Sequence, residues 1–145
     1  MNPTSVENRT LLVVDDEPTV LNLCQSILAR GGYSVLRASN AEEALRVIRT
    51  CKTPILLALL DVIMPGMNGI ELANRIQNEH PSIRVVLMSG YGVQEISRLT
   101  GREPVNFRTI WKPFRSESLL RMIENVLDEP DASARAAVGG PGSQR

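Results

Sequence analysis

Five polar side chains lie where apolar runs of about the length of a β-strand come to an end: Asp15, Asp16, Asp61, Ser89 and Lys112. The carboxyl ends of parallel strands meet at one edge of a sheet, so we expect these side chains to lie together. A carboxylate can attack phosphorus and form an acyl phosphate, while a metal ion, an ammonium group and a hydroxyl stabilise charge on the transferred group. These residue types therefore indicate phosphoryl transfer to an aspartate.

Three carboxylates in one place would raise one another's pKa unless a cation lay among them. Magnesium fits that position, because it takes oxygen ligands, keeps several waters and is typically held by one or two carboxylates plus phosphate oxygens. Asp61 is the first candidate for the reacting carboxylate, since the uninterrupted apolar run 54–60 predicts a strand covered on both faces that ends at this residue. An aspartate before Pro65-Gly66 can also be only a turn-former, so Asp61 alone does not decide the function.

The elements that would position these residues alternate regularly along the chain. Apolar runs predict five strands, at 11–14, 33–38, 54–60, 84–88 and 107–111. Apolar residues at helical spacing predict helices from about 18 to 30, 41 to 48, 69 to 79, 93 to 99 and 116 to 127, the fourth being the least regular. Because crossovers between parallel strands are right-handed and each helix covers a face, we expect a doubly wound α/β fold with a five-stranded parallel sheet.

Polar residues before these helices predict how each helix begins. An acidic residue within 15–17 is expected to cap the first helix, with Pro18 in its first turn. Asn40 and Asn68 each precede a glutamate by three residues, which is typical of a capping box. Ser116 is expected to cap the last helix.

The chain of 145 residues suits one domain, which we expect to span 10–128 between a flexible leader at 1–9 and a disordered, Gly/Pro-rich tail at 129–145. Sixteen basic and sixteen acidic residues give a formal net charge of zero without a long block of either sign, which argues against a nucleic-acid partner. The apolar runs are strand-sized and no secretory leader opens the chain, so we expect neither a membrane span nor export. A cytoplasmic protein is the resulting expectation.

The same residues resemble a known family, the receiver domains of two-component response regulators. The resemblance covers about residues 10–128 and rests on the pair Asp15-Asp16, the segment 61–69 (DVIMPGMNG), the hydroxyl of Ser89 and the pair Lys112-Pro113. It implies a flavodoxin-like sheet in the order 2-1-3-4-5.

The resemblance also implies a role for each residue at the predicted site. Asp61 would be the phosphoacceptor, Asp16 a direct magnesium ligand, and Asp15 an acidic partner acting largely through metal-bound water. The backbone carbonyl of Ile63 would complete the protein ligands of the metal. Ser89 and Lys112 would each bond a phosphoryl oxygen.

One position departs from the family pattern. Many receivers carry an aromatic residue three positions before the lysine, where this chain has Thr109. Strand alternation places Phe107 and Trp111 on the same face as Thr109, so we expect Trp111 either to report the change at the site or simply to pack against a neighbouring helix. Tyr91 is expected to be either an exposed loop residue or a residue over the site that tunes the lifetime of the phosphoryl group.

Three functions remain open at this point. The first is a signalling module that receives phosphate from a sensor histidine kinase and changes its binding to an unknown downstream protein, which the lack of an output domain in the sequence favours. The second is a phosphorelay intermediate or hybrid-kinase receiver that passes phosphate to a histidine phosphotransfer protein. The third is a phosphohydrolase, which would need a general acid two residues after Asp61, where the chain has Ile63. We therefore expect no enzymatic turnover beyond self-phosphorylation and slow self-dephosphorylation.

Overall fold

The computed structural model describes residues 9–104 and 106–130. Its strands are β1 (Thr10–Val14), β2 (Ser34–Ala38), β3 (Ile55–Asp61), β4 (Arg84–Ser89) and β5 (Arg108–Trp111). Its helices are α2 (Pro18–Arg30), α3 (Ala41–Thr50), α4 (Gly69–Glu79), α5 (Val93–Thr100) and α6 (Ser116–Asp128). The predicted leader and tail lie outside the described residues, except for Arg9, Glu129 and Pro130.

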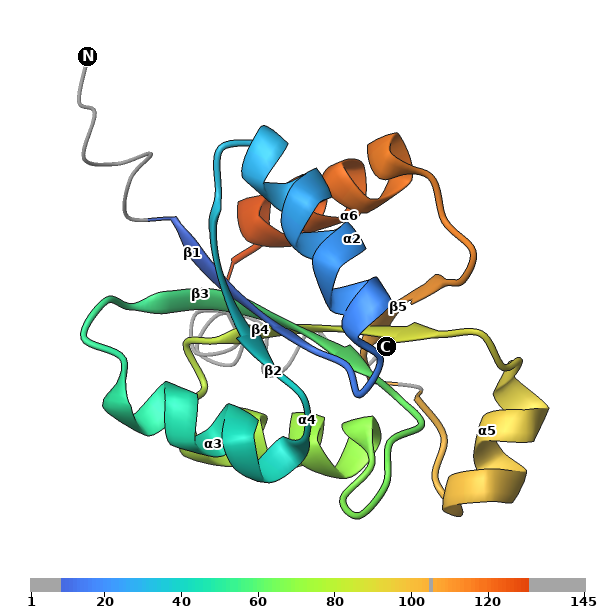
Figure 1. The fold of residues 1–145 in the computed structure, drawn as a ribbon. Helices are drawn as coiled ribbons and strands as arrows, with labels where there is room; N and C mark the ends of the chain where they lie inside the picture. The colour runs from blue at the N-terminus through green and yellow to red at the C-terminus, as the bar shows by residue number, and fades with distance from the viewer. Residues whose placement is uncertain (1–8, 105, 131–145) are drawn as a thin grey trace.

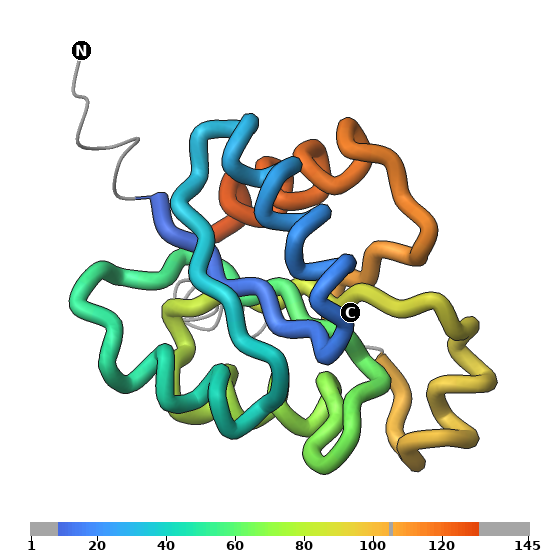
Figure 2. Tube along the Cα trace, viewed as in Figure 1, coloured from blue at the N-terminus to red at the C-terminus, as the bar shows by residue number. Residues whose placement is uncertain are grey.

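The five strands form one parallel sheet in the order β2-β1-β3-β4-β5, which confirms the predicted doubly wound fold. Helices α2 and α6 lie against one face of the sheet, and α3 and α4 lie against the other (Figure 1). The chain turns that follow β1, β3 and β4 are all on the same side of the molecule (Figure 2). This arrangement brings the ends of three strands to one edge.

Each strand of the sheet's centre contributes to two separate cores, because successive side chains point to opposite faces. In β3, Leu57 and Leu59 pack with α2 and α6, whereas Ala58 and Leu60 pack with α3 and α4. All four are fully buried, as expected for a strand covered on both faces. The apolar run before Asp61 therefore anchors the end of this strand firmly.

The helix starts follow the sequence prediction only in part. Asn68 and Glu71 form a complete capping box at α4. Asn40 accepts a hydrogen bond from the Glu43 backbone N–H, but the Glu43 carboxylate bonds Ser39 instead of returning to Asn40.

Two capping predictions were wrong. Glu17 occupies the N-cap position of α2 without a side-chain hydrogen bond, and its own backbone N–H donates to the Asp15 carboxylate. Ser116 is the first helical residue of α6 and Arg115 occupies the N-cap position, also without a side-chain cap.

The fourth predicted helix is present as α5, which has eight residues and is followed by Gly101, its C-cap, in the left-handed conformation (φ +72°). Its apolar stripe is less buried than the pattern suggested. Only Ile96 enters the core, while Val93 and Leu99 are each 46% exposed. The next strand, β5, is at the edge of the sheet, as its polar residues predicted.

No helix within the described ranges combines the length and the apolar character that a bilayer crossing requires.

Candidate functional site

The three aspartates converge at the carboxyl edge of the sheet, as the sequence predicted. One carboxylate oxygen from each of Asp15, Asp16 and Asp61 lies within 4.8 Å of the other two. Asp15 follows β1 and remains hydrogen-bonded to the neighbouring strand through its N–H, which donates to the Ala38 carbonyl at 3.1 Å. Asp15 and Asp61 are buried, and Asp16 is exposed. The cluster therefore has two carboxylates held by the sheet and one that faces solvent.

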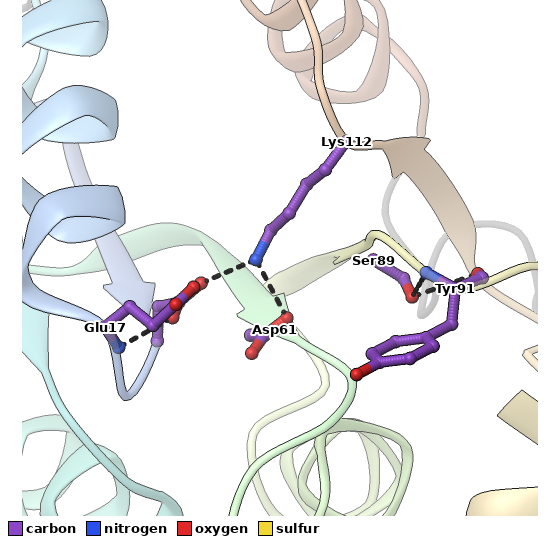
Figure 3. A network of polar contacts seen from close by, with 6 residues as sticks. Glu17, Asp61, Ser89, Tyr91 and Lys112 are labelled. Atoms are coloured by element: carbon purple, nitrogen blue, oxygen red, sulfur yellow. Dashed lines mark hydrogen bonds and ion pairs between the residues drawn. The ribbon is translucent and has the colours of Figure 1, made fainter.

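Lys112 reaches into this cluster from the end of β5 (Figure 3). Its ammonium donates to Asp15 Oδ2 at 3.1 Å and to Asp61 Oδ1 at 3.2 Å. The backbone N–H of Lys112 also donates to the Ser89 carbonyl at 2.8 Å. This bond fixes the segment that begins at Lys112 to the end of β4. One ammonium thus bridges carboxylates that come from two different strands.

The electrostatics of the site follow from this burial. Burial and the neighbouring charge of Asp15 raise the pKa of Asp61 to about 7, although Lys112 acts in the opposite direction. Burial would lower the pKa of Lys112, but the charges of Asp61 and Asp15 outweigh it and leave that pKa above its usual value. The lysine ammonium alone does not compensate the crowded carboxylates.

The donor set of the cluster fits a hard divalent cation. Carboxylate oxygens are ligands that magnesium prefers, and an exposed carboxylate beside two buried ones leaves room for the waters that this ion keeps. A divalent charge would also relieve the repulsion that raises the pKa of Asp61.

Ser89 lies next to the acidic cluster, but its hydroxyl is bonded within its own loop. Its Oγ accepts from the Tyr91 N–H at 2.9 Å and donates to the Tyr91 carbonyl at 3.1 Å. Ser89 is 1% exposed, whereas the Tyr91 side chain beyond it is 44% exposed. The tyrosine ring extends from this loop on the side of the site that holds Asp61 (Figure 3). A hydroxyl in this state must rotate before it can bond another oxygen.

Comparison with known proteins decides the family. The family model described as the response regulator receiver domain matches residues 11–124. The chain belongs to this family. Its fold is similar to that of a CheY-like receiver domain protein from Methanospirillum hungatei JF-1, with 31% identity and a TM-score of 0.72 over 83% of this chain and 94% of that one.

Two further relatives give this receiver domain its context. The response regulator TrrA from Thermotoga maritima, solved in complex with Mg(2+)-BeF, is 28% identical, with a TM-score of 0.70 over 81% of this chain and 98% of that one. The transcriptional regulatory protein AruR of Pseudomonas aeruginosa is 34% identical over 122 residues, which are 81% of this chain and 48% of the relative. The chain spans about half the length of the curated relatives that it matches.

The predicted switch residues of this receiver domain lie along β5. Thr109 is half-buried, and Phe107 before the strand packs against the core on the α3 and α4 face. Trp111 is 43% exposed, and both expectations for it, as a reporter of the change at the site and as a residue packed against a neighbouring helix, stay predictions. Its backbone pairs in register with Ser89, which keeps it close to the loop whose movement it was expected to report.

Sequence reasoning missed two features of the receiver site. The burial of Asp15 and its direct pairing with Lys112 were not foreseen, although a residue that directly follows a strand often still belongs to the ladder. The bonding of Ser89 to Tyr91 was also missed, and here the Ser-Gly-Tyr-Gly segment carried the signal, since serine hydroxyls commonly bond the backbone two residues on. The roles given to Asp16 and the Ile63 carbonyl stay predictions.

Proposed function

We propose that this receiver domain accepts a phosphoryl group on Asp61 from a sensor histidine kinase, in a magnesium-dependent reaction, and thereby changes its binding to a downstream protein. The observation that carries the proposal is the joint placement of three carboxylates within 4.8 Å and a lysine ammonium 3.2 Å from Asp61. Membership of the family supports the kinase as the phosphoryl source.

Asp61 is the nucleophile in this proposal. Its carboxylate oxygen forms a bond to phosphorus, while the bond between phosphorus and the donor's histidine nitrogen breaks and the electron pair stays on that nitrogen. Lys112, already in contact with Asp61, is placed to pair with an oxygen of the arriving group. Ser89 would supply a hydroxyl to another oxygen once its bond to the Tyr91 carbonyl opens.

Asp15, Asp16 and Asp61 would hold the magnesium ion, together with the Ile63 carbonyl. The bound ion supplies positive charge next to the oxygens of the transferring group. The buried carboxylates of Asp15 and Asp61 would hold the ion from the ends of two strands, and the exposed Asp16 would add a ligand from the loop after β1.

We further propose that the domain does not hydrolyse phosphate esters. Such a reaction needs an acid near the leaving group, and the residue two positions after Asp61 is Ile63, whose side chain packs against the core. We therefore expect the phosphoryl group on Asp61 to be hydrolysed only slowly by the domain itself.

The test is intact-protein mass spectrometry after incubation with acetyl phosphate and magnesium. We expect a single phosphate adduct that is absent in Asp61→Asn and present in the matched control Asp128→Asn, which changes an exposed aspartate at the end of α6. Omission of magnesium should also abolish the adduct. An adduct that persists in Asp61→Asn would contradict the assignment of the nucleophile.

A further inference from the structure

A second polar site lies at the opposite edge of the sheet from the acidic cluster. Arg84 is the first residue of β4 and Arg108 is the first residue of β5. Arg108 pairs in register with Val86, whose side chain lies in the core beneath α6. Arg84 is two residues before Val86 in the same strand and therefore lies on the same face of the sheet. Both arginines are thus on the face that α6 covers. Because these strands are parallel, both arginines lie at their amino ends, a strand length away from Asp61 and Lys112.

These arginines line a cleft of about 270 Å³. Its lining also includes the apolar side chains of Ile83 and Phe107, the amide side chains of Gln77 and Asn106, and Glu129 just after α6. Such a volume is at the small end of ligand sites, so the cleft suits a compact molecule. Two guanidinium groups and one carboxylate leave the described lining with one excess positive charge.

One of the two arginines, Arg84, has a donor without a hydrogen-bond partner. Arg108 pairs with the carboxylate of Glu129, and Arg84 Nη2 donates to the Glu129 carbonyl at 2.6 Å. Arg84 Nε is the one buried side-chain nitrogen or oxygen without a hydrogen-bond partner among residues 9–104 and 106–130. Buried N–H groups rarely stay without a partner, and a guanidinium group presents its donors as a fork that matches the two oxygens of an oxyanion.

We propose that this cleft binds a small oxyanion, either a phosphate or a dicarboxylate, between Arg84 and Arg108. The carboxylate of Glu129 shows how an oxyanion sits on Arg108, and it is also the internal competitor that an external ligand would displace. The proposed site is separate from the phosphoacceptor site and shares no residue with it.

The test is a titration of the ¹⁵N-labelled full chain with inorganic phosphate in one arm and succinate in the other, followed by two-dimensional NMR. Metal ions are removed beforehand on a chelating resin and ionic strength is held constant with chloride, since the attraction depends on salt. Without magnesium the acidic cluster repels both anions. We expect saturable shifts at the amides of Arg84, Asn106 and Glu129, with no shifts at Asp61 or Ser89.

Three variants decide the assignment. Arg108→Gln should weaken binding by roughly tenfold or more, because it removes charge-assisted hydrogen bonds. Arg84→Lys keeps the charge but removes Nε, and should also weaken binding. Glu129→Gln removes the competing carboxylate, and should strengthen binding severalfold.

Arg75→Gln is the matched control, since the Arg75 side chain is 46% exposed against 50% for Arg108 and pairs with a surface glutamate. It should leave the affinity unchanged, and the dispersion of the same spectra reports whether each variant is folded. Saturation by only one anion assigns the ligand to that class. Shifts that do not saturate with either anion, or an affinity that survives Arg108→Gln, would overturn the proposal.

Discussion

The folded protein disfavours the charged form of the Asp61 carboxyl group. Burial and Asp15 hold its pKa near 7, against 3.8 for the free group. The folded state therefore binds this proton more tightly than the unfolded state. Because the folded state binds more protons in this range, the free energy of unfolding falls as pH rises from the lower pKa to the higher one.

Metal-free protein should accordingly lose stability between pH 3.8 and about 7. Asp61→Asn removes the ionisable group, so above pH 7 this variant should be more stable than the unmodified chain by on the order of a few kcal/mol, with the difference vanishing near pH 4. Urea unfolding of both proteins across this range, in metal-free buffer, measures the effect. A difference that does not change with pH would show that the charge of Asp61 is not its cause.

Asp16 and Lys112 should respond differently to substitution. Asp16→Ala should abolish magnesium binding measured by titration calorimetry, because it removes an oxygen ligand. Lys112→Ala should retain magnesium binding, since an ammonium is not a ligand and its contacts with Asp15 and Asp61 oppose a cation there. The Lys112 variant should nevertheless fail to couple phosphorylation to partner binding. Loss of the metal in Lys112→Ala would reverse these role assignments.

At the scale of elements, the connection between β3 and α4 sets where Asp61 sits. Gly69, the first residue of α4, donates its N–H to the Val62 carbonyl at 2.8 Å. A Cβ atom at Gly69 would lie 2.2 Å from the backbone oxygen of Asp61. Only a residue without a side chain lets the helix begin this close to the strand.

Gly69→Ala should therefore destabilise the protein by about 3 kcal/mol, because backbone atoms must move to admit the methyl group. Gly92→Ala is the matched control: Gly92 also lies at the start of a helix on this edge, as the N-cap residue of α5, but a Cβ there meets nothing within 4 Å. Urea denaturation should show a large loss for the first variant and a small change for the second. Equal losses would mean that the close approach is not what makes Gly69 necessary.

The edge strand β5 offers a spectroscopic probe of the site. Trp111 is the chain's single tryptophan and its backbone pairs with Ser89. If beryllofluoride and magnesium turn the Ser89 hydroxyl away from the Tyr91 loop, the surroundings of this exposed indole should change. We expect a magnesium-dependent fluorescence response that disappears in Ser89→Ala. An unchanged spectrum with the mimic bound would remove Trp111 from the mechanism.

At the scale of the whole molecule, the alternation of apolar runs with helical stripes was enough to predict the sheet, its layers and the meeting of the three aspartates. These features follow from hydrophobic periodicity, which can be read locally in the sequence, and from the rule that crossovers between parallel strands are right-handed. The hydrogen-bond and ion-pair partners of the polar groups could not be predicted from this local pattern. Lys112 contacts Asp15, and Arg108 contacts Glu129, through folding of segments that are distant along the chain. The helical spacing of Val93 and Leu99 on α5 likewise did not predict that both side chains are exposed.

The bond between Lys112 and Asp15 joins residues 97 positions apart. During synthesis the first aspartates leave the ribosome long before the lysine does, so an unfinished chain cannot assemble the site however well its early strands fold. A chain that ends before Lys112 would present Asp15 and Asp61 without the ammonium that pairs with both. The site would thus be complete only once the segment that carries Lys112 has folded onto the sheet.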